Sequence, residues 1–195
     1  IFTTDMLPDD DYRLKTNTSF EGYDVFTLKQ NQGFYNQYTQ NSLQVNNGSG
    51  QFYETGFFSG VAASDWSWGA LFFDADNDGR QDMFVTRDAN KPLFLHNETP
   101  SVGAWLGVNV QGVTTNRDGR GALVSVTAVE GEEPQLTYVG TSGSFLTHDG
   151  RVTHFGLGEL TKNIFEVKVT FPVSGKEVVL NNVKPQEVID IIEPE

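Results

Sequence analysis

Alternating apolar and polar residues, interrupted by turns rich in Gly, Asn and Asp, dominate the second half of this chain. Val124 and Val126 mark one face of such a run, and Val167 and Val169 mark another. A period of two residues predicts half-buried β-strands. The expected strands cover residues 105–110, 122–129, 135–140, 152–157, 164–171, 177–180 and 187–192. This many short strands in one region favour a small β-sandwich or barrel.

The first half gives a β pattern only from residue 41 onward. Residues 41–60 predict a hairpin, because Leu43 and Val45 alternate with polar residues and Asn-Asn-Gly-Ser-Gly at 46–50 is a strong turn signal. Three further apolar runs predict strands, at 69–73, 83–86 and 92–97. No segment shows the 3.6-residue apolar period of a helix, so we expect an all-β fold. We place a boundary near residues 99–101, which gives domains 1–100 and 101–195.

The loop at 74–82 carries the strongest chemical signal in the sequence. Aspartates stand at its positions 1, 3, 5 and 9, and Gly79 at position 6 permits a sharp turn. Oxygen donors at this density suit a hard cation such as Ca²⁺, which takes about 6–8 oxygen ligands. The candidate ligands are the carboxylates of Asp74, Asp76, Asp78 and Asp82 and the main-chain carbonyl of Arg80.

This loop differs from an EF-hand. An EF-hand has a bidentate Glu at position 12 and a helix on each side, whereas position 12 here is Val85 and both flanks predict strands. A calcium ion would therefore bridge two β-strands. The alternative is an ordinary Asp- and Gly-rich hairpin turn without a metal.

Charge and composition narrow the functional classes. With 13 basic and 26 acidic residues the net charge is −13, which argues against binding to nucleic acid or to anionic membrane surfaces. The chain has no cysteine, so disulfides and thiolate metal sites are excluded. No stretch approaches the roughly 18 apolar residues of a membrane span. Because weak calcium sites are common in extracellular modules, we expect an extracellular, cell-surface or periplasmic location.

Aromatic residues supply further candidates for a binding site. Trp66 and Trp68 would share one face of a strand and, with Tyr35 and Tyr38, could stack against a glycan; packing in a core is the alternative. The histidines are His96, His148 and His154. No Ser-His-Asp arrangement, phosphate loop or zinc cluster accompanies them, so we expect a protein that is not an enzyme.

Two parts of the chain resemble known families. Residues 65–85, from Asp-Trp-Ser-Trp-Gly through the aspartate loop, resemble an FG-GAP or VCBS repeat, and residues 41–52 match the strand pair that precedes the calcium strand in such proteins. Residues 116–195 resemble the ASPIC/UnbV domain. That resemblance depends on Asn-Arg-Asp-Gly-Arg-Gly-Ala at 116–122, residues 140–145, His-Phe-Gly-Leu-Gly at 154–158, residues 167–172 and Ser-Gly-Lys at 174–176.

The resemblance implies partial β-propeller blades with a calcium loop, followed by a β-sandwich or barrel-like domain. One clear repeat is too few for a propeller, because a blade buries its faces against its neighbours. We therefore expect the C-terminal part of a larger propeller protein, or a subunit that docks on a partner chain. The expected function is a non-enzymatic calcium-binding interaction module. The alternative is a glycan-active enzyme or a glycan-binding propeller fragment, and an architectural cap on a larger surface complex is a third interpretation.

Overall fold

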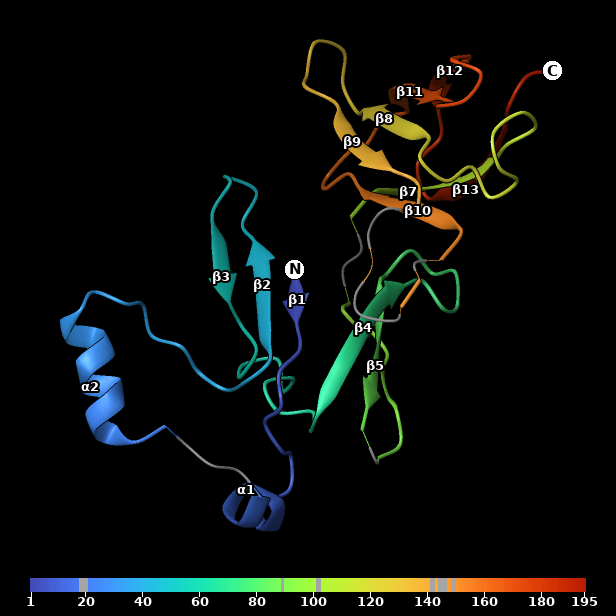
Figure 1. The fold of residues 1–195 in the computed structure, drawn as a ribbon. Coiled ribbons are helices and arrows are strands. Elements are labelled where there is room, and N and C mark those ends of the chain that lie inside the picture. The colour runs from blue at the N-terminus through green and yellow to red at the C-terminus, as the bar shows by residue number, and fades with distance from the viewer. Residues whose placement is uncertain (18–20, 89, 101–102, 141–142, 144–146, 149) are drawn as a thin grey trace. The chain divides into compact units, whose positions relative to one another are not determined.

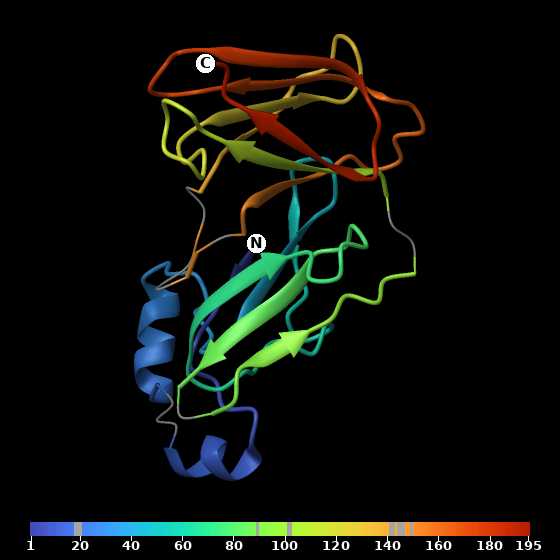
Figure 2. The same cartoon turned by 90° about the vertical axis from the view of Figure 1, so that its right-hand side faces the viewer.

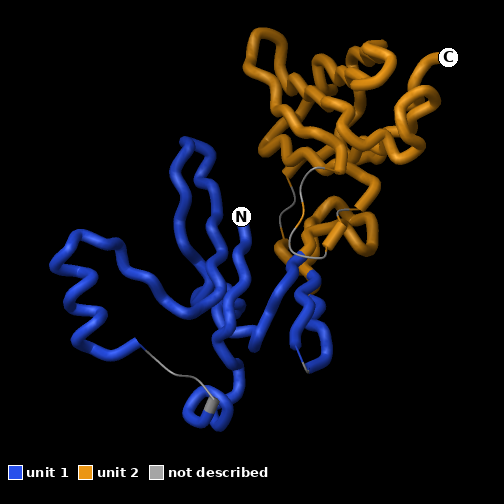
Figure 3. The backbone as a smooth tube through the Cα atoms, viewed as in Figure 1, with its two compact units in different colours: residues 1–70, 84–94 blue, residues 71–83, 95–195 orange. Residues whose placement is uncertain are grey.

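The computed structural model describes residues 1–17, 21–88, 90–100, 103–140, 143, 147–148 and 150–195. Strands far outnumber helices in these ranges, so the all-β prediction is confirmed (Figure 1). The chain divides into two compact units, residues 1–70 with 84–94 and residues 71–83 with 95–195 (Figure 3). The aspartate loop belongs to the second unit. The family-based division at residue 100 stays a prediction.

The C-terminal region forms two sheets from the seven strands that the sequence predicts (Figure 2). In the first sheet, β7 lies between β10, which is antiparallel to it, and β13, which is parallel. The second sheet has the order β12-β11-β8-β9. The strands are β7 (Trp105–Gln111), β8 (Leu123–Thr127), β9 (Gln135–Tyr138), β10 (Val152–Gly156), β11 (Ile164–Thr170), β12 (Glu177–Val183) and β13 (Glu187–Ile192).

One hydrophobic core joins these two sheets. Leu106 and Val108 of β7 are fully buried in the same cluster as residues from β8 and β11. In the second sheet, Val167 of β11 lies opposite Val126 of β8. The alternating apolar positions therefore point inward from both sheets, as in a β-sandwich. Neither sheet closes on itself, so the described strands form no barrel.

A buried carboxylate fastens the chain just after β13. Glu193 accepts hydrogen bonds from the main-chain N–H groups of Val113 (2.6 Å) and Thr115 (2.7 Å) and from the hydroxyls of Thr115 (2.9 Å) and Ser174 (2.5 Å). Burial alone would raise the pKa of Glu193, but these hydrogen bonds together lower that pKa to about 2. Glu193 thus joins the C-terminal end to two turns of the sandwich.

The N-terminal hairpin is also confirmed. Strands β2 (Ser42–Asn46) and β3 (Phe52–Glu54) pair antiparallel, with Val45 opposite Tyr53. A short strand that the sequence did not predict, β1 (Phe2–Thr3), pairs with the other edge of β2.

The structure also contains helices that the sequence pattern did not reveal. Two short helices, α1 (Asp11–Asn17) and α2 (Tyr23–Asn31), precede the hairpin. Helix α2 buries none of its residues, so its sequence carries no apolar stripe that a periodicity search could detect. Asp10 caps α1 by accepting the N–H of Arg13 at 2.9 Å, which gives the Asp9–Asp11 run a local helix-starting role. Neither described helix is long and apolar enough to cross a membrane.

Polar contacts hold the first unit together. Asn41 is fully buried, accepts the N–H of Asp5 at 2.7 Å and donates to the carbonyl of Val61 at 2.9 Å. Asp65, also fully buried, forms an ion pair with Arg13. The hydrophobic cluster of the sandwich has no counterpart of similar size among the described residues of this unit.

A third sheet has the order β4-β5-β6 and frames the aspartate loop. Its strands are β4 (Ser67–Phe73), β5 (Asp82–Arg87) and β6 (Leu93–Leu95). The strand predictions for 69–73 and 83–86 are confirmed, and the one for 92–97 is confirmed in shorter form. This sheet positions residues 74–81 between two neighbouring strands. The assignment of this sheet as a propeller blade stays a prediction.

Candidate metal centre

Main-chain N–H groups organise the aspartate loop from within. Asp74 accepts the N–H of Gly79 at 2.8 Å and that of Asp78 at 3.1 Å, and Asp78 accepts the N–H of Arg80 at 2.8 Å. Gly79 has φ of 87° and Asn77 has φ of 62°, in the left-handed region that Gly and Asn tolerate best. Asn77 and Gly79 therefore allow the backbone to turn so that its N–H groups face the carboxylates of the same loop.

Asp82 fastens the loop at its base. It is almost fully buried, with 1% of its surface exposed. One of its carboxylate oxygens accepts the N–H of Ala75 at 3.1 Å, and the other accepts the N–H of Asn97 at 2.8 Å. Asp82 thus links the start of the loop to the segment that follows β6.

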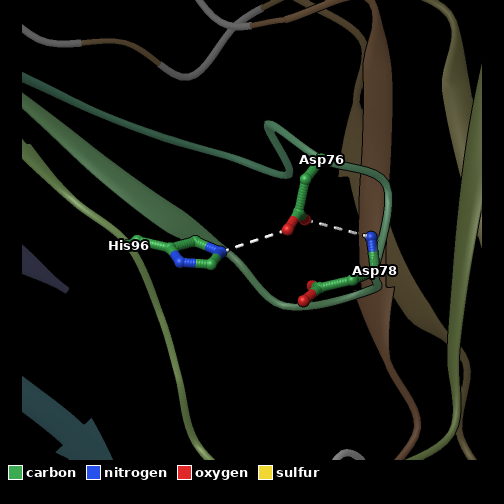
Figure 4. A group of neighbouring side chains, drawn as sticks. All are labelled: Asp76, Asp78 and His96. Carbon is green, nitrogen blue, oxygen red and sulfur yellow. Dashed lines mark hydrogen bonds and ion pairs between the residues drawn. The ribbon is translucent and has the colours of Figure 1, made fainter.

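Asp76, Asp78 and His96 converge at the mouth of the loop (Figure 4). Each offers a possible metal-ligating atom, and these atoms lie within 4.8 Å of one another. Nε2 of His96 is 3.1 Å from a carboxylate oxygen of Asp76 and 3.9 Å from one of Asp82. Two of the predicted ligands therefore meet here. Asp74 and Asp82 lie outside this group, and their carboxylates accept main-chain N–H groups of the loop and of Asn97.

His96 is the site residue that sequence reasoning missed. It lies 14 positions after Asp82, immediately beyond β6, and no motif connects it to the loop. Only the side-by-side order of β4, β5 and β6 brings the end of β6 back to the turn between β4 and β5. Strand order in a sheet was the information that could have identified it.

Arg80 contributes a positive charge beside the predicted ligands. Its guanidinium forms an ion pair with Asp78 and donates to the carbonyl of Thr99 at 3.2 Å. The hydrogen bond from the Arg80 N–H and the nearby guanidinium hold the pKa of Asp78 below its usual value. Asp78 is therefore an anion at neutral pH and has no proton to lose before it binds a cation.

The residues present fit a hard divalent cation. Four carboxylates within nine residues face one guanidinium, so like charges repel one another across the loop. Asp76 and Asp78 already converge, and hydrogen bonds to the same turn hold Asp74 close to them. Carboxylate and carbonyl oxygens are the donors that Ca²⁺ uses in proteins.

The loop packs against the sandwich through Gly79. A methyl group added at Gly79 would lie 1.9 Å from Nε1 of Trp105, so the backbone and the indole are in close contact. Trp105 stacks in turn on His154, with ring centroids 5.8 Å apart and planes 13° from parallel. Burial lowers the pKa of His154, and the negative charge of Asp74 opposes that change. His154 is thus in packing contact with Trp105.

The aromatic candidates are exposed. Trp66 and Trp68 have 41% and 53% of their surfaces accessible, and Tyr35 and Tyr38 have 96% and 62%. Tyr38 lines an open cavity of about 420 Å³ beside α2, whereas the other three aromatic candidates do not line it. The four residues form two pairs that are far apart in the sequence. Trp66 directly precedes β4 and Trp68 lies within it, whereas Tyr35 and Tyr38 follow α2.

The fold and the loop together define an all-β protein with a C-terminal β-sandwich and an acidic loop between adjacent strands. Residues 112–195 match the family model described as ASPIC and UnbV, in agreement with the resemblance of residues 116–195. The match spans β8 to β13 of the sandwich. A search of curated proteins found no match. The resemblance of residues 65–85 to an FG-GAP or VCBS repeat stays a prediction.

Proposed function

We propose that this chain is a non-enzymatic, calcium-stabilised interaction module of the extracellular space, cell surface or periplasm. The observation that carries the proposal is the inward-curled aspartate loop between β4 and β5. Asp74, Asp76, Asp78 and Asp82 would hold the ion with the carbonyl of Arg80. Bound calcium would neutralise the mutual repulsion of these carboxylates and stabilise the folded chain by mass action.

The exposed aromatic residues of the first unit support the interaction part of the proposal. Phe57 and Phe58 have 70% and 94% of their surfaces accessible, and Tyr53 and Phe52 of β3 are also exposed. Large apolar side chains that are exposed next to one another in the sequence, as at residues 52–53 and 57–58, can mark contact with another protein. The partner would be the remaining blades of a larger propeller protein or a separate protein chain.

Thermal unfolding in EDTA and then in a calcium titration tests the proposal. We expect calcium to raise the melting temperature of the wild-type chain and to have no such effect on Asp76→Asn/Asp78→Asn. The matched control is Glu132→Gln/Glu133→Gln, which removes the same charge from an exposed turn and should keep the calcium response. A wild-type melting temperature that calcium does not change would refute the calcium part of the proposal.

A glycan-binding module is the second candidate. It is favoured by Trp66 and Trp68, which are separated by a single residue and are both substantially exposed. Aromatic faces of this kind can stack on sugar rings. Affinity electrophoresis in polysaccharide gels should then show retardation that Trp66→Ala/Trp68→Ala abolishes. Phe57→Ala/Phe58→Ala, which removes two other exposed aromatics, is the matched control, and equal loss in both variants would reject a glycan platform at the tryptophans.

A further inference from the structure

His96 adds a nitrogen donor to a loop whose other candidate ligands are all oxygens. Figure 4 shows the imidazole directed at the carboxylate of Asp76, with the carboxylate of Asp78 beside it. His96 comes from a different segment than the two aspartates, so its presence is not a consequence of the loop motif. The side chain is 41% exposed, which leaves it accessible to an ion from solvent.

The chain next to His96 is fixed to the loop. The main-chain N–H of Asn97 donates to Asp82 at 2.8 Å, and its side-chain amide donates to the carbonyl of Gln81 at 3.2 Å. These two hydrogen bonds hold the backbone of the adjacent residue in register with β5. The sheet and these hydrogen bonds therefore hold His96 close to the loop. Metal ligands in proteins are commonly held in place by such surrounding contacts.

Ligand chemistry separates two kinds of ion. Calcium binds oxygen ligands and gains little binding energy from an imidazole nitrogen. Zinc and its first-row neighbours bind imidazole nitrogen and carboxylate oxygen together, most often in sites of about four ligands. Two carboxylates and one imidazole supply three such ligands, which leaves one position for water.

We propose that Asp76, Asp78 and His96 form a binding site for a divalent transition-metal ion of the zinc class. This inference rests on the proposed function only in taking the loop as a cation site. Asp76 and Asp78 belong to both donor sets, so the transition metal and calcium compete for the loop. The loop would then respond to two ions, with His96 favouring zinc over calcium.

The charges around the site agree with this assignment. Asp82, whose carboxylate oxygen is 3.9 Å from Nε2 of His96, adds negative charge near the same ring nitrogen that faces Asp76. Glu98 adds more, with a carboxylate oxygen 3.9 Å from Nδ1. The guanidinium of Arg80 offsets part of this charge through its ion pair with Asp78. A divalent cation therefore enters a site whose neighbouring carboxylates outnumber its one guanidinium.

Isothermal titration calorimetry with Zn²⁺ and with Ca²⁺ tests the assignment on the full chain, with Co²⁺ absorption as a probe of nitrogen ligation. We expect His96→Gln to weaken Zn²⁺ binding by about tenfold or more and to leave Ca²⁺ affinity within about twofold, because only the transition metal uses the imidazole. It should also alter the visible absorption of bound Co²⁺. His148→Gln, a change at another exposed histidine, is the matched control and should leave the binding of both ions unchanged.

Two of the possible results separate this inference from the proposed function. Calcium binding in the wild-type chain, together with Zn²⁺ affinity that His96→Gln leaves unchanged, overturns the inference and leaves the calcium proposal intact. Zn²⁺ binding that depends on His96, without any calcium binding, supports the inference and rejects the calcium proposal. Equal losses in the His96 and His148 variants overturn the inference, and so does a wild-type chain that binds neither ion.

Discussion

Gly79→Ala tests whether the aspartate loop is held against the sandwich. The substitution acts through two physical effects. Gly79 has φ of 87°, and an alanine in the left-handed region is disfavoured by about 1–2 kcal/mol. The added methyl group would also lie 1.9 Å from Nε1 of Trp105, 2.3 Å from Cε2 and 2.4 Å from Cδ1. Those distances are far below van der Waals contact.

The indole cannot turn aside at low cost. Trp105 is 8% exposed and stacks on His154, so relieving the collision moves a packed ring or lifts the loop away from it. Overpacking of this kind typically destabilises a protein by about 1–3 kcal/mol. The two effects together predict a destabilisation of about 2–5 kcal/mol for Gly79→Ala.

Gly131→Ala separates the two effects. Gly131 has φ of 85° and lies in the same compact unit, and a methyl group added there would have no neighbouring atom within 4 Å. This variant therefore carries the backbone effect alone. Urea unfolding followed by circular dichroism and by tryptophan fluorescence gives both free energies. The reasoning would be refuted if Gly79→Ala were no more destabilising than Gly131→Ala.

Two further predictions concern ionised groups in the two units. The pKa of Glu193 falls from 4.5 to about 2 on folding, so the ionised carboxylate stabilises the folded chain fully above pH 4.5, and this stabilisation is lost as the pH falls toward 2. In Glu193→Gln, the free energy of unfolding measured with urea should therefore decrease less between pH 4.5 and pH 2 than it does in the wild-type chain. Arg13→Ala leaves the buried carboxylate of Asp65 without its ion partner and should destabilise the first unit by about 1–3 kcal/mol. Lys15→Ala, which breaks only an exposed pair, should change stability by less than about 0.5 kcal/mol in the same assay.

The sequence predicted the sandwich well because its strands bury one face. Val124 and Val126 of β8, and Val167 and Val169 of β11, alternate with more accessible residues, and each pair points into the shared core. Gly-containing turns end the runs. A period of two with clear turns identifies strands without any knowledge of their partners.

The same reasoning failed where no apolar period exists. Helix α2 buries none of its residues, so its formation depends on local backbone hydrogen bonds rather than on an apolar face. Arg13 and Asp65 are 52 positions apart and both are charged, so their contact leaves no local hydrophobic pattern from which it could be predicted. His96 was missed for the same reason, since its proximity to Asp76 follows from strand order alone.

The difference in burial between the two units favours a partner for the first one. The sandwich hides a continuous apolar cluster, whereas the first unit relies on Asn41 and the Asp65 ion pair and leaves Phe57, Phe58 and Trp68 substantially exposed. Covering one large apolar side chain is worth about 1.5–3 kcal/mol, so a protein surface over several of these residues would add stability comparable to that of a small domain. A metal ion cannot replace that contribution, because the aspartate loop lies in the second unit. Calcium and a protein partner would therefore stabilise different parts of the chain. Unfolding followed separately in the two units should show a calcium effect on the sandwich that is larger than its effect on the hairpin.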